Sequence, residues 1–216
     1  MNQEELFLTL QQASLANGVL TKLHTGKLDE SDLTKLADIC GEIESVIENN
    51  TTLDKQWLNL IRYSPLNTQK LIDGGKLPPA DLTCRGIEMI RNCFRRCEER
   101  LDISETEDSS VKTIIGLLDA EDSFIVQFRI HNIICEEKAM ELENALRKLK
   151  SYAEAETIPK SLALCLFFLP YSFYWNSLYL QEPEHRKSFN DVCRRVVEAI
   201  DYVLGHESHN NARFAY

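Results

Sequence analysis

Two pairs of residues have spacings that resemble parts of metal sites. Cys93 and Cys97 stand one helical turn apart, but a zinc site needs four ligands and no second cysteine pair accompanies them. His206 and His209 are three residues apart, whereas the metalloprotease signature requires two histidines four apart on one helix. Because both ligand sets are incomplete, we expect no metal ion and no other cofactor. The cysteines are interpreted as small hydrophobic side chains.

Residue patterns that would serve catalysis are also incomplete. Glu182 and His185 have the Glu-x-x-His spacing of di-iron bundles, which require two such pairs and two further glutamates. Four glutamates between residues 136 and 143 surround Lys138, a pattern typical of a solvated, ion-paired helix face. Residues 74–76 lack the earlier glycine and the following serine or threonine of a phosphate-binding loop. The sequence therefore predicts a protein that is not an enzyme.

Five arginines between residues 85 and 100 form the one basic concentration in the chain. Guanidinium groups bind carboxylates and phosphates through charge-assisted hydrogen bonds, so we expect an acidic or phosphorylated protein segment as the ligand. The alternative is a face that is neutralised internally, by glutamates of the same helix or by the acidic stretch 102–110. The candidate partner-binding residues, which lie broadly opposite the apolar stripe of this helix, are Arg85, Asn92, Arg95 and Arg96.

Residues 161–181 form an uncharged stretch that is rich in aromatic side chains. Pro170 and interspersed serine and asparagine residues make it a poor membrane-spanning segment, so we expect a buried helix. Its aromatic side chains exceed what one helix face needs. This leaves open a protein-binding groove or a small-ligand pocket besides core packing. The candidate pocket residues are Tyr171, Tyr174, Trp175 and Tyr179.

Composition limits the classes of partner. The chain has 216 residues, a formal net charge of −10 and 44% hydrophobic residues, as expected of a folded globular protein. The negative charge argues against nucleic acids and anionic membranes as partners. Seven cysteines, an odd number, and an acidic N-terminus without the pattern of a signal peptide predict a reducing compartment, the cytoplasm or the nucleus.

Apolar residues recur at helical spacing along most of the chain, and no useful window alternates with period two. The fold class is therefore predicted to be all-α, either an irregular helical bundle or a short helical stack. A single domain is expected over residues 1–205, followed by a flexible tail at 206–216, with 73–79 as an internal loop. Helices are expected at about 3–17, 19–25, 31–48, 52–61, 66–72, 80–101, 111–118, 121–152, 161–181 and 183–205.

One segment resembles a known family. Residues 82–94, Leu-Thr-Cys-Arg-Gly-Ile-Glu-Met-Ile-Arg-Asn-Cys-Phe, contain an apolar-Arg-Asn run similar to the third helix of an armadillo repeat. Residues 57–60 and 67–72 are similar to the end of another repeat. The resemblance covers residues 51–101 and implies a short armadillo/HEAT-like stack, in which Asn92 would line a groove that holds an extended peptide. The rest of the chain shows no clear 40-residue period.

These observations favour a non-enzymatic, intracellular protein–protein interaction module of adaptor or regulatory type. Its partner is expected to be another protein that offers an acidic or phosphorylated segment. One alternative is an inhibitor or immunity-type protein whose negative charge masks a basic partner. Another is a small-molecule binder or enzyme with a pocket at the 161–181 aromatic cluster.

Overall fold

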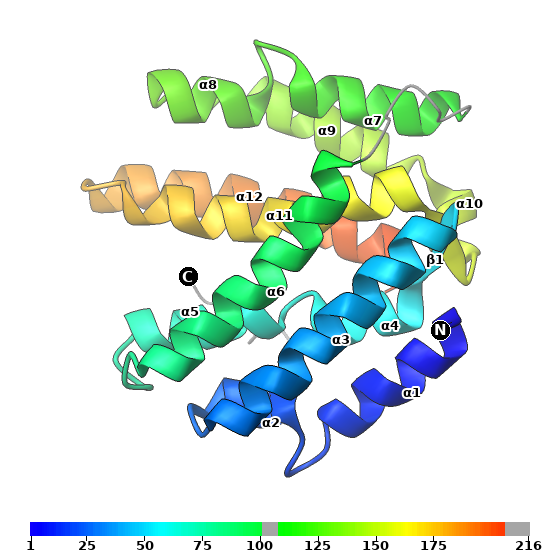
Figure 1. Cartoon of the computed structure of the whole chain (residues 1–216). Helices are drawn as coiled ribbons and strands as arrows, with labels where there is room; N and C mark the ends of the chain where they lie inside the picture. The colour runs from blue at the N-terminus through cyan, green and yellow to red at the C-terminus, as the bar shows by residue number, and fades with distance from the viewer. Residues whose placement is uncertain (101–107, 206–216) are drawn as a thin grey trace. The chain divides into compact units, whose positions relative to one another are not determined.

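The computed structural model of the chain describes residues 1–100 and 108–205, which are mostly helical (Figure 1). Contacts divide the chain into two compact units, which we call unit 1 (Met1–Leu101) and unit 2 (Asp102–Tyr216). The predicted all-α fold class is confirmed. The single domain over residues 1–205 stays a prediction, and the predicted flexible tail at 206–216 lies outside the described residues. The expected internal loop at 73–79 joins two helices of unit 1.

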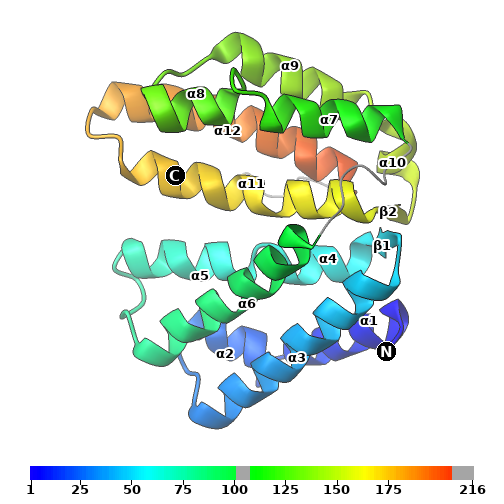
Figure 2. The same ribbon diagram turned by 45° about the horizontal axis from the view of Figure 1, so that its top comes forward.

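In unit 1, the first three helices pack against the next three in the same order along the chain. α1 contacts α4, α2 contacts α5, and α3 contacts α6, so two successive sets of three helices lie against each other. α3 and α6 run side by side in Figures 1 and 2. The described elements of unit 1 are α1 (Gln3–Ala13), α2 (Val19–Thr25), α3 (Glu30–Asn49), the strand β1 (Thr52–Asp54), α4 (Lys55–Ile61), α5 (Ser64–Asp73) and α6 (Asp81–Glu99).

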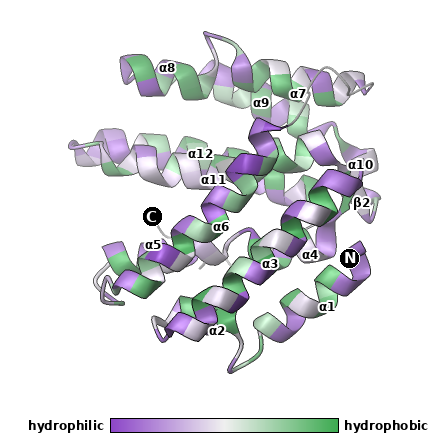
Figure 3. Cartoon of the chain, in the orientation of Figure 1, coloured by the Kyte–Doolittle hydropathy of each residue, from purple (hydrophilic) through white to green (hydrophobic). Residues whose placement is uncertain are grey.

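The ends of these helices follow from local chemistry. The side chains of Asn2 and Asp29 accept hydrogen bonds from the first turns of α1 and α3, which satisfies backbone donors that have no intrahelical partner. Gly26 ends α2 in the left-handed conformation, with φ of 69°. Along α3, hydrophobic and hydrophilic residues alternate as the helix turns (Figure 3). Apolar residues that recur at helical spacing along α3 are buried: Leu33, Leu36, Cys40, Ile43 and Ile47.

Unit 2 resembles unit 1 in its packing, because α7 contacts α11 and α9 contacts α12. Its described elements are α7 (Ser109–Asp119), α8 (Phe124–His131), α9 (Glu136–Arg147), α10 (Lys150–Glu154), the strand β2 (Thr157–Pro159), α11 (Lys160–Leu178) and α12 (Pro183–Val203).

The predicted continuous helix over residues 121–152 is wrong, because the structure has α8, α9 and α10 there. α8 ends at Asn132, whose φ of 55° is left-handed and cannot continue a right-handed helix. The apolar residues Ile133, Ile134 and Cys135 carry the hydrophobic period across this break, which is why the pattern concealed it.

α11 corresponds to the uncharged stretch and confirms the expected buried helix. Leu162, Ala163, Leu164 and Leu166 are all buried, and consecutive residues cannot share one helix face, so α11 is covered on more than one side. Pro170 lies within it. Among the described helices, none combines the length and the apolar character that crossing a bilayer would require.

The two units contain corresponding elements in the same order. α1, α2 and α3 correspond to α7, α8 and α9–α10; β1 corresponds to β2, α4–α5 to α11, and α6 to α12. The left-handed C-cap Gly26 of α2 matches the left-handed C-cap Asn132 of α8. Three residue types recur at one constant shift along the chain: Thr52, Lys55 and Pro65 in unit 1, and Thr157, Lys160 and Pro170 in unit 2.

Candidate interaction surface

α6 packs on the other helices of unit 1 through a stripe that the sequence predicted. Gly86 permits the close approach, since a Cβ at this position would lie 2.9 Å from a Leu23 methyl carbon and 3.0 Å from one of Leu28. The opposite face of α6 is therefore left for solvent or a partner. The predicted stripe residues that are buried are Ile87, Ile90, Phe94 and Cys97, whereas Leu101 lies outside the described residues.

Arg85 and Arg96 of α6, with its C-cap residue Arg100, form a row of ion pairs with α3. Arg85 Nη1 lies 3.3 Å from Glu30 Oε1, and Arg96 Nε donates to Glu44 Oε1 at 3.1 Å. Arg100 pairs with Glu48. The hydrogen bonds to Glu44 hold the pKa of Arg96 above its ordinary value.

This row supplies an internal partner that sequence reasoning missed. The expected internal partners were glutamates of the same helix or the stretch 102–110, most of which lies outside the described residues. The glutamates of α3 take that role for Arg96 and Arg100, and Arg85 pairs both with Glu30 of α3 and, at 3.7 Å, with Asp81 of its own helix. The sequence held a signal for these pairs. Glu30, Glu44 and Glu48 are separated by nearly whole helical turns, so they lie on one face of α3.

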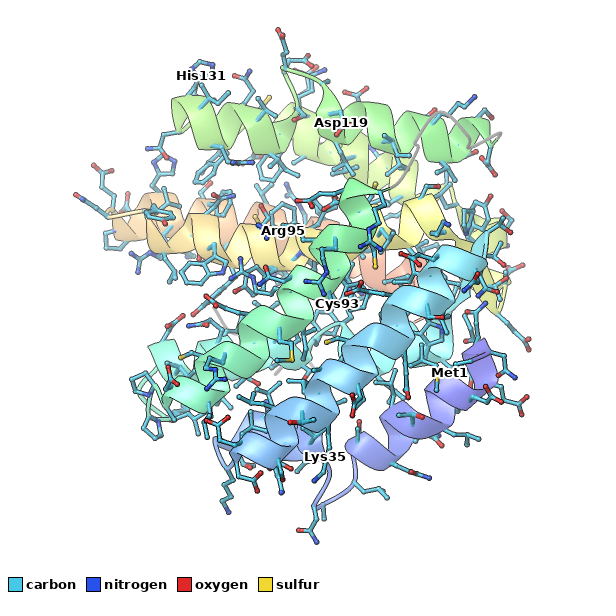
Figure 4. All side chains as sticks on the ribbon, viewed as in Figure 1. Met1, Lys35, Cys93, Arg95, Asp119 and His131 are labelled. Atoms are coloured by element: carbon cyan, nitrogen blue, oxygen red, sulfur yellow. The ribbon has the colours of Figure 1, made fainter. Side chains whose placement is uncertain are left out.

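Arg95 and Asn92 differ from the paired arginines. The side chain of Arg95 is 63% exposed, and its ion pair is with Glu99 of its own helix, at 3.7 Å. Figure 4 shows Arg95 and Cys93 on α6. Asn92 is half-buried and its side chain makes no hydrogen bond within the described part of the chain. An amide in this position can both donate and accept, and Arg95 follows it within one helical turn.

Beneath this face, α3 and α6 meet at three thiols. Cys93 Sγ donates to the backbone oxygen of Cys40 at 3.3 Å, and both residues are buried together with Cys97. Hydrogen bonding to Cys40 raises the pKa of Cys93, and the bond from Cys93 lowers the pKa of Cys97. All seven cysteines are free thiols. The contacts are those of small side chains that fill the space between two helices.

The other candidate ligands are placed apart. Glu182 is the N-cap of α12 and His185 lies in the first turn of that helix, while His206 and His209 lie outside the described residues. Within residues 1–100 and 108–205, no group of three histidine, cysteine or acidic side chains lies close enough together to hold a metal ion.

The candidate pocket residues are brought together only in part. The Trp175 ring lies 6.0 Å from that of Tyr171 and 6.3 Å from that of Tyr174, whereas Tyr179 follows the end of α11 and is 78% exposed. The pocket itself stays a prediction. Other aromatic contacts of unit 2 lie elsewhere: Phe189 stacks on Phe128 at 3.9 Å and on Phe124 at 5.9 Å, and Phe124 lies edge-on to Phe173 of α11 at 5.8 Å. This cluster joins α8 to α11 and α12, which lie far from α8 in the sequence.

Comparisons of the chain with protein-family models, with curated proteins and with solved structures gave no match. The function proposed below therefore depends on the geometry of α3 and α6 alone.

Proposed function

We propose that the protein is a non-enzymatic protein–protein interaction module, of adaptor or regulatory type, whose α3–α6 face binds an acidic or phosphorylated segment of another protein. The observation that carries the proposal is the pair Asn92 and Arg95. Within the described structure they offer a half-buried amide without a hydrogen bond and, within one turn, an exposed guanidinium whose one ion pair, with Glu99, has a length of 3.7 Å. An amide suits the backbone of an extended segment, and a guanidinium suits its acidic or phosphorylated side chain.

The ion pairs with α3 are compatible with such a ligand. Arg85, Arg96 and Arg100 are between 44% and 54% exposed, and exposed ion pairs contribute only about 0–1 kcal/mol each. A phosphate carries nearly two negative charges and three acceptor oxygens, so it competes well with one glutamate for these guanidinium groups. In the proposed function, the ion pairs keep these guanidinium groups ordered, and a phosphate that binds replaces the glutamates as their hydrogen-bond acceptor.

The packing also supports a helical-repeat architecture of the armadillo type that residues 51–101 resemble. In unit 1, each helix of the first set of three contacts its counterpart in the second set, as expected of stacked repeats. Stacking of this kind places α3 and α6, the last helix of each set, side by side. The free thiols support the proposed reducing compartment, the cytoplasm or the nucleus.

Peptide selection on the purified full-length chain tests the proposal. A library of acidic, phosphorylated, neutral and basic peptides is passed over the immobilised protein, and bound sequences are identified. We expect enrichment of acidic or phosphorylated peptides, and we expect Arg95→Glu to weaken their binding at least tenfold through like-charge repulsion. The matched control is Arg194→Glu on α12, because Arg194 is 48% exposed and, among the residues that the structure describes, also pairs only with acidic residues of its own helix.

Two results would contradict this function. One is a selection without acidic preference, and the other is equal loss of binding in Arg95→Glu and Arg194→Glu. Enrichment of basic peptides would instead favour the inhibitor or immunity-type alternative, which the net charge of −10 supports.

A further inference from the structure

Large hydrophobic side chains are exposed at one end of unit 2. The turn from α8 to α9 and the turn from α11 to α12 lie at the same end of this unit in both ribbon views, and His131 marks that end in Figure 4. The stack of Phe128 on Phe189 ties α8 to the first half of α12 there. We call the following residues the apolar end: Ile130, Ile133, Met140, Leu178 and Tyr179, with exposed fractions from 42% for Leu178 to 78% for Tyr179.

Unit 1 supplies an internal control for this surface. Counting from the left-handed C-caps of α2 and α8, Ile130 and Ile133 correspond to His24 and Lys27. Counting from the N-caps of α3 and α9, Met140 corresponds to Thr34. All three counterparts are exposed and polar.

The other turn gives the same result. Leu178 is the last residue of α11 and Tyr179 is its C-cap, and the corresponding residues of α5 are Asp73 and Gly74. Both counterparts are exposed. The same scaffold thus folds with polar residues or glycine at all five positions, so folding does not require hydrophobic side chains there. Exposed clusters of this kind mark interaction sites.

The charges around the apolar end are of both signs. Arg129 and His131 end α8, Glu136 and Glu137 begin α9, and Glu182 and Glu184 flank the start of α12. Within the described structure none of these six side chains takes part in an ion pair, whereas the arginines of α6 that face α3 are paired with its glutamates. A surface that has an apolar centre and separate basic and acidic groups around it is complementary to the same surface on a second copy of the chain. When two copies meet about a two-fold axis, the basic group of each faces an acidic group of the other.

We propose that the protein forms a homodimer through the apolar end of unit 2, with a second copy of this chain as the occupant. Ile130, Ile133 and Tyr179 form the centre of the interface, because they are the most exposed of the five. Arg129 of each copy pairs with the acidic start of α9 or α12 of the other. This surface belongs to unit 2 and shares no residue with the α3–α6 face of unit 1.

Sedimentation equilibrium of the full chain over a range of concentrations tests the proposal. The molecular mass of the wild type is expected to rise from that of one chain to that of two as the concentration increases. Salt is expected to weaken the dimer in part, because it screens the ion pairs of the charged rim. Ile133→Glu and Tyr179→Glu each bury an unpaired charge in the dimer and are expected to raise the dissociation constant at least tenfold. The matched control is Leu15→Glu, because Leu15 is 65% exposed and lies in unit 1. It is expected to leave the dissociation constant unchanged, and circular dichroism confirms that each variant is folded.

Three outcomes would overturn the homodimer. The first is a wild type that stays monomeric up to about 1 mM, where even a weak specific dimer forms. The second is a dimer that Ile133→Glu and Tyr179→Glu both leave intact. The third is a dimer that Leu15→Glu dissociates as strongly as they do. A monomeric wild type that binds a different protein through the apolar end would also overturn the second copy as occupant.

Discussion

Asp32 fixes the start of α3, the helix that carries the glutamates of the ion-pair row, and its replacement by asparagine tests how firmly that helix is held. The carboxylate is 1% exposed and accepts hydrogen bonds from Lys22 Nζ at 2.8 and 3.0 Å, from Lys35 Nζ at 3.2 Å and from the backbone N–H of Asp29 at 3.1 Å. Burial by itself would raise the pKa of Asp32. The bonds from Lys22, Asp29 and Lys35 outweigh burial and lower this pKa from 3.8 to about 2.

The pKa difference gives the expected magnitude and its pH dependence. A carboxyl whose pKa falls from 3.8 to about 2 on folding stabilises the folded state by roughly 2 kcal/mol at pH 7. Because the folded pKa is depressed, this stabilisation is complete above the unfolded pKa and is lost as the pH falls towards about 2. Asparagine keeps an oxygen for the N–H of Asp29 but cannot attract the two ammonium groups. Asp32→Asn is therefore expected to lower the free energy of unfolding by roughly 2 kcal/mol at pH 7 and by about half of that near pH 3.

Urea denaturation followed by tryptophan fluorescence measures this difference. The chain has two tryptophans, so a Trp175→Phe background leaves Trp57 as the reporter of unit 1. The control is Asp38→Asn, an exposed acid on the same helix, which is expected to change the free energy of unfolding by less than about 0.5 kcal/mol. Equal effects of the two substitutions, or an effect of Asp32→Asn that stays constant between pH 7 and pH 3, would refute the reasoning.

Two further substitutions test the packing of each unit. Gln3→Leu removes the oxygen that accepts from Trp57 Nε1 at 3.0 Å and from the N–H of Asp54 at 2.6 Å. Since the indole N–H of a fully buried Trp57 is left unpaired, urea denaturation should show a loss of about 1–3 kcal/mol, against none for the exposed Gln12→Leu. Phe189→Ala removes the ring that stacks on Phe124 and Phe128, so a loss of about 3–5 kcal/mol is expected in the same measurement. A change no larger than that of the exposed neighbour Ser188→Ala would show that the stack contributes little.

The sequence predicted the helices of unit 1 well because their ends carry strong local signals. The caps at Asp29 and Gly26, and the apolar stripe that begins at Ile87, each depend on residues close together in the chain. The break at Asn132 was missed because asparagine adopts the left-handed conformation less regularly than glycine, and apolar residues follow it directly. The strands β1 and β2, of three residues each, are too short for period two to show.

The candidate site was predicted in part, for a physical reason. Periodicity along α6 identifies which residues lie opposite its buried stripe, and it selected Asn92 and Arg95 correctly as residues outside that stripe. Periodicity carries no information on the neighbouring helix. The pairing of Arg85 with Glu30 and of Arg96 with Glu44 depends on how α3 packs against α6, and each pair joins residues more than 50 positions apart.

The correspondence between the units was also visible in the sequence as a repeated Thr, Lys and Pro at fixed spacing, but the intervening residues differ too much for a period to be evident. At several positions that both units bury, both keep an apolar side chain: Leu36 matches Leu142, and Cys40 matches Leu146. Packing favours this similarity, because an apolar side chain of suitable size fills a core position without leaving a polar group to be satisfied. Exposed positions carry no such constraint, so a consistent change there, such as His24 to Ile130, requires a cause other than folding. The units thus share a scaffold and differ in their exposed residues, and under the two proposals above the charged groups of α6 bind a partner of unit 1 while the apolar end of unit 2 binds a second copy of the chain.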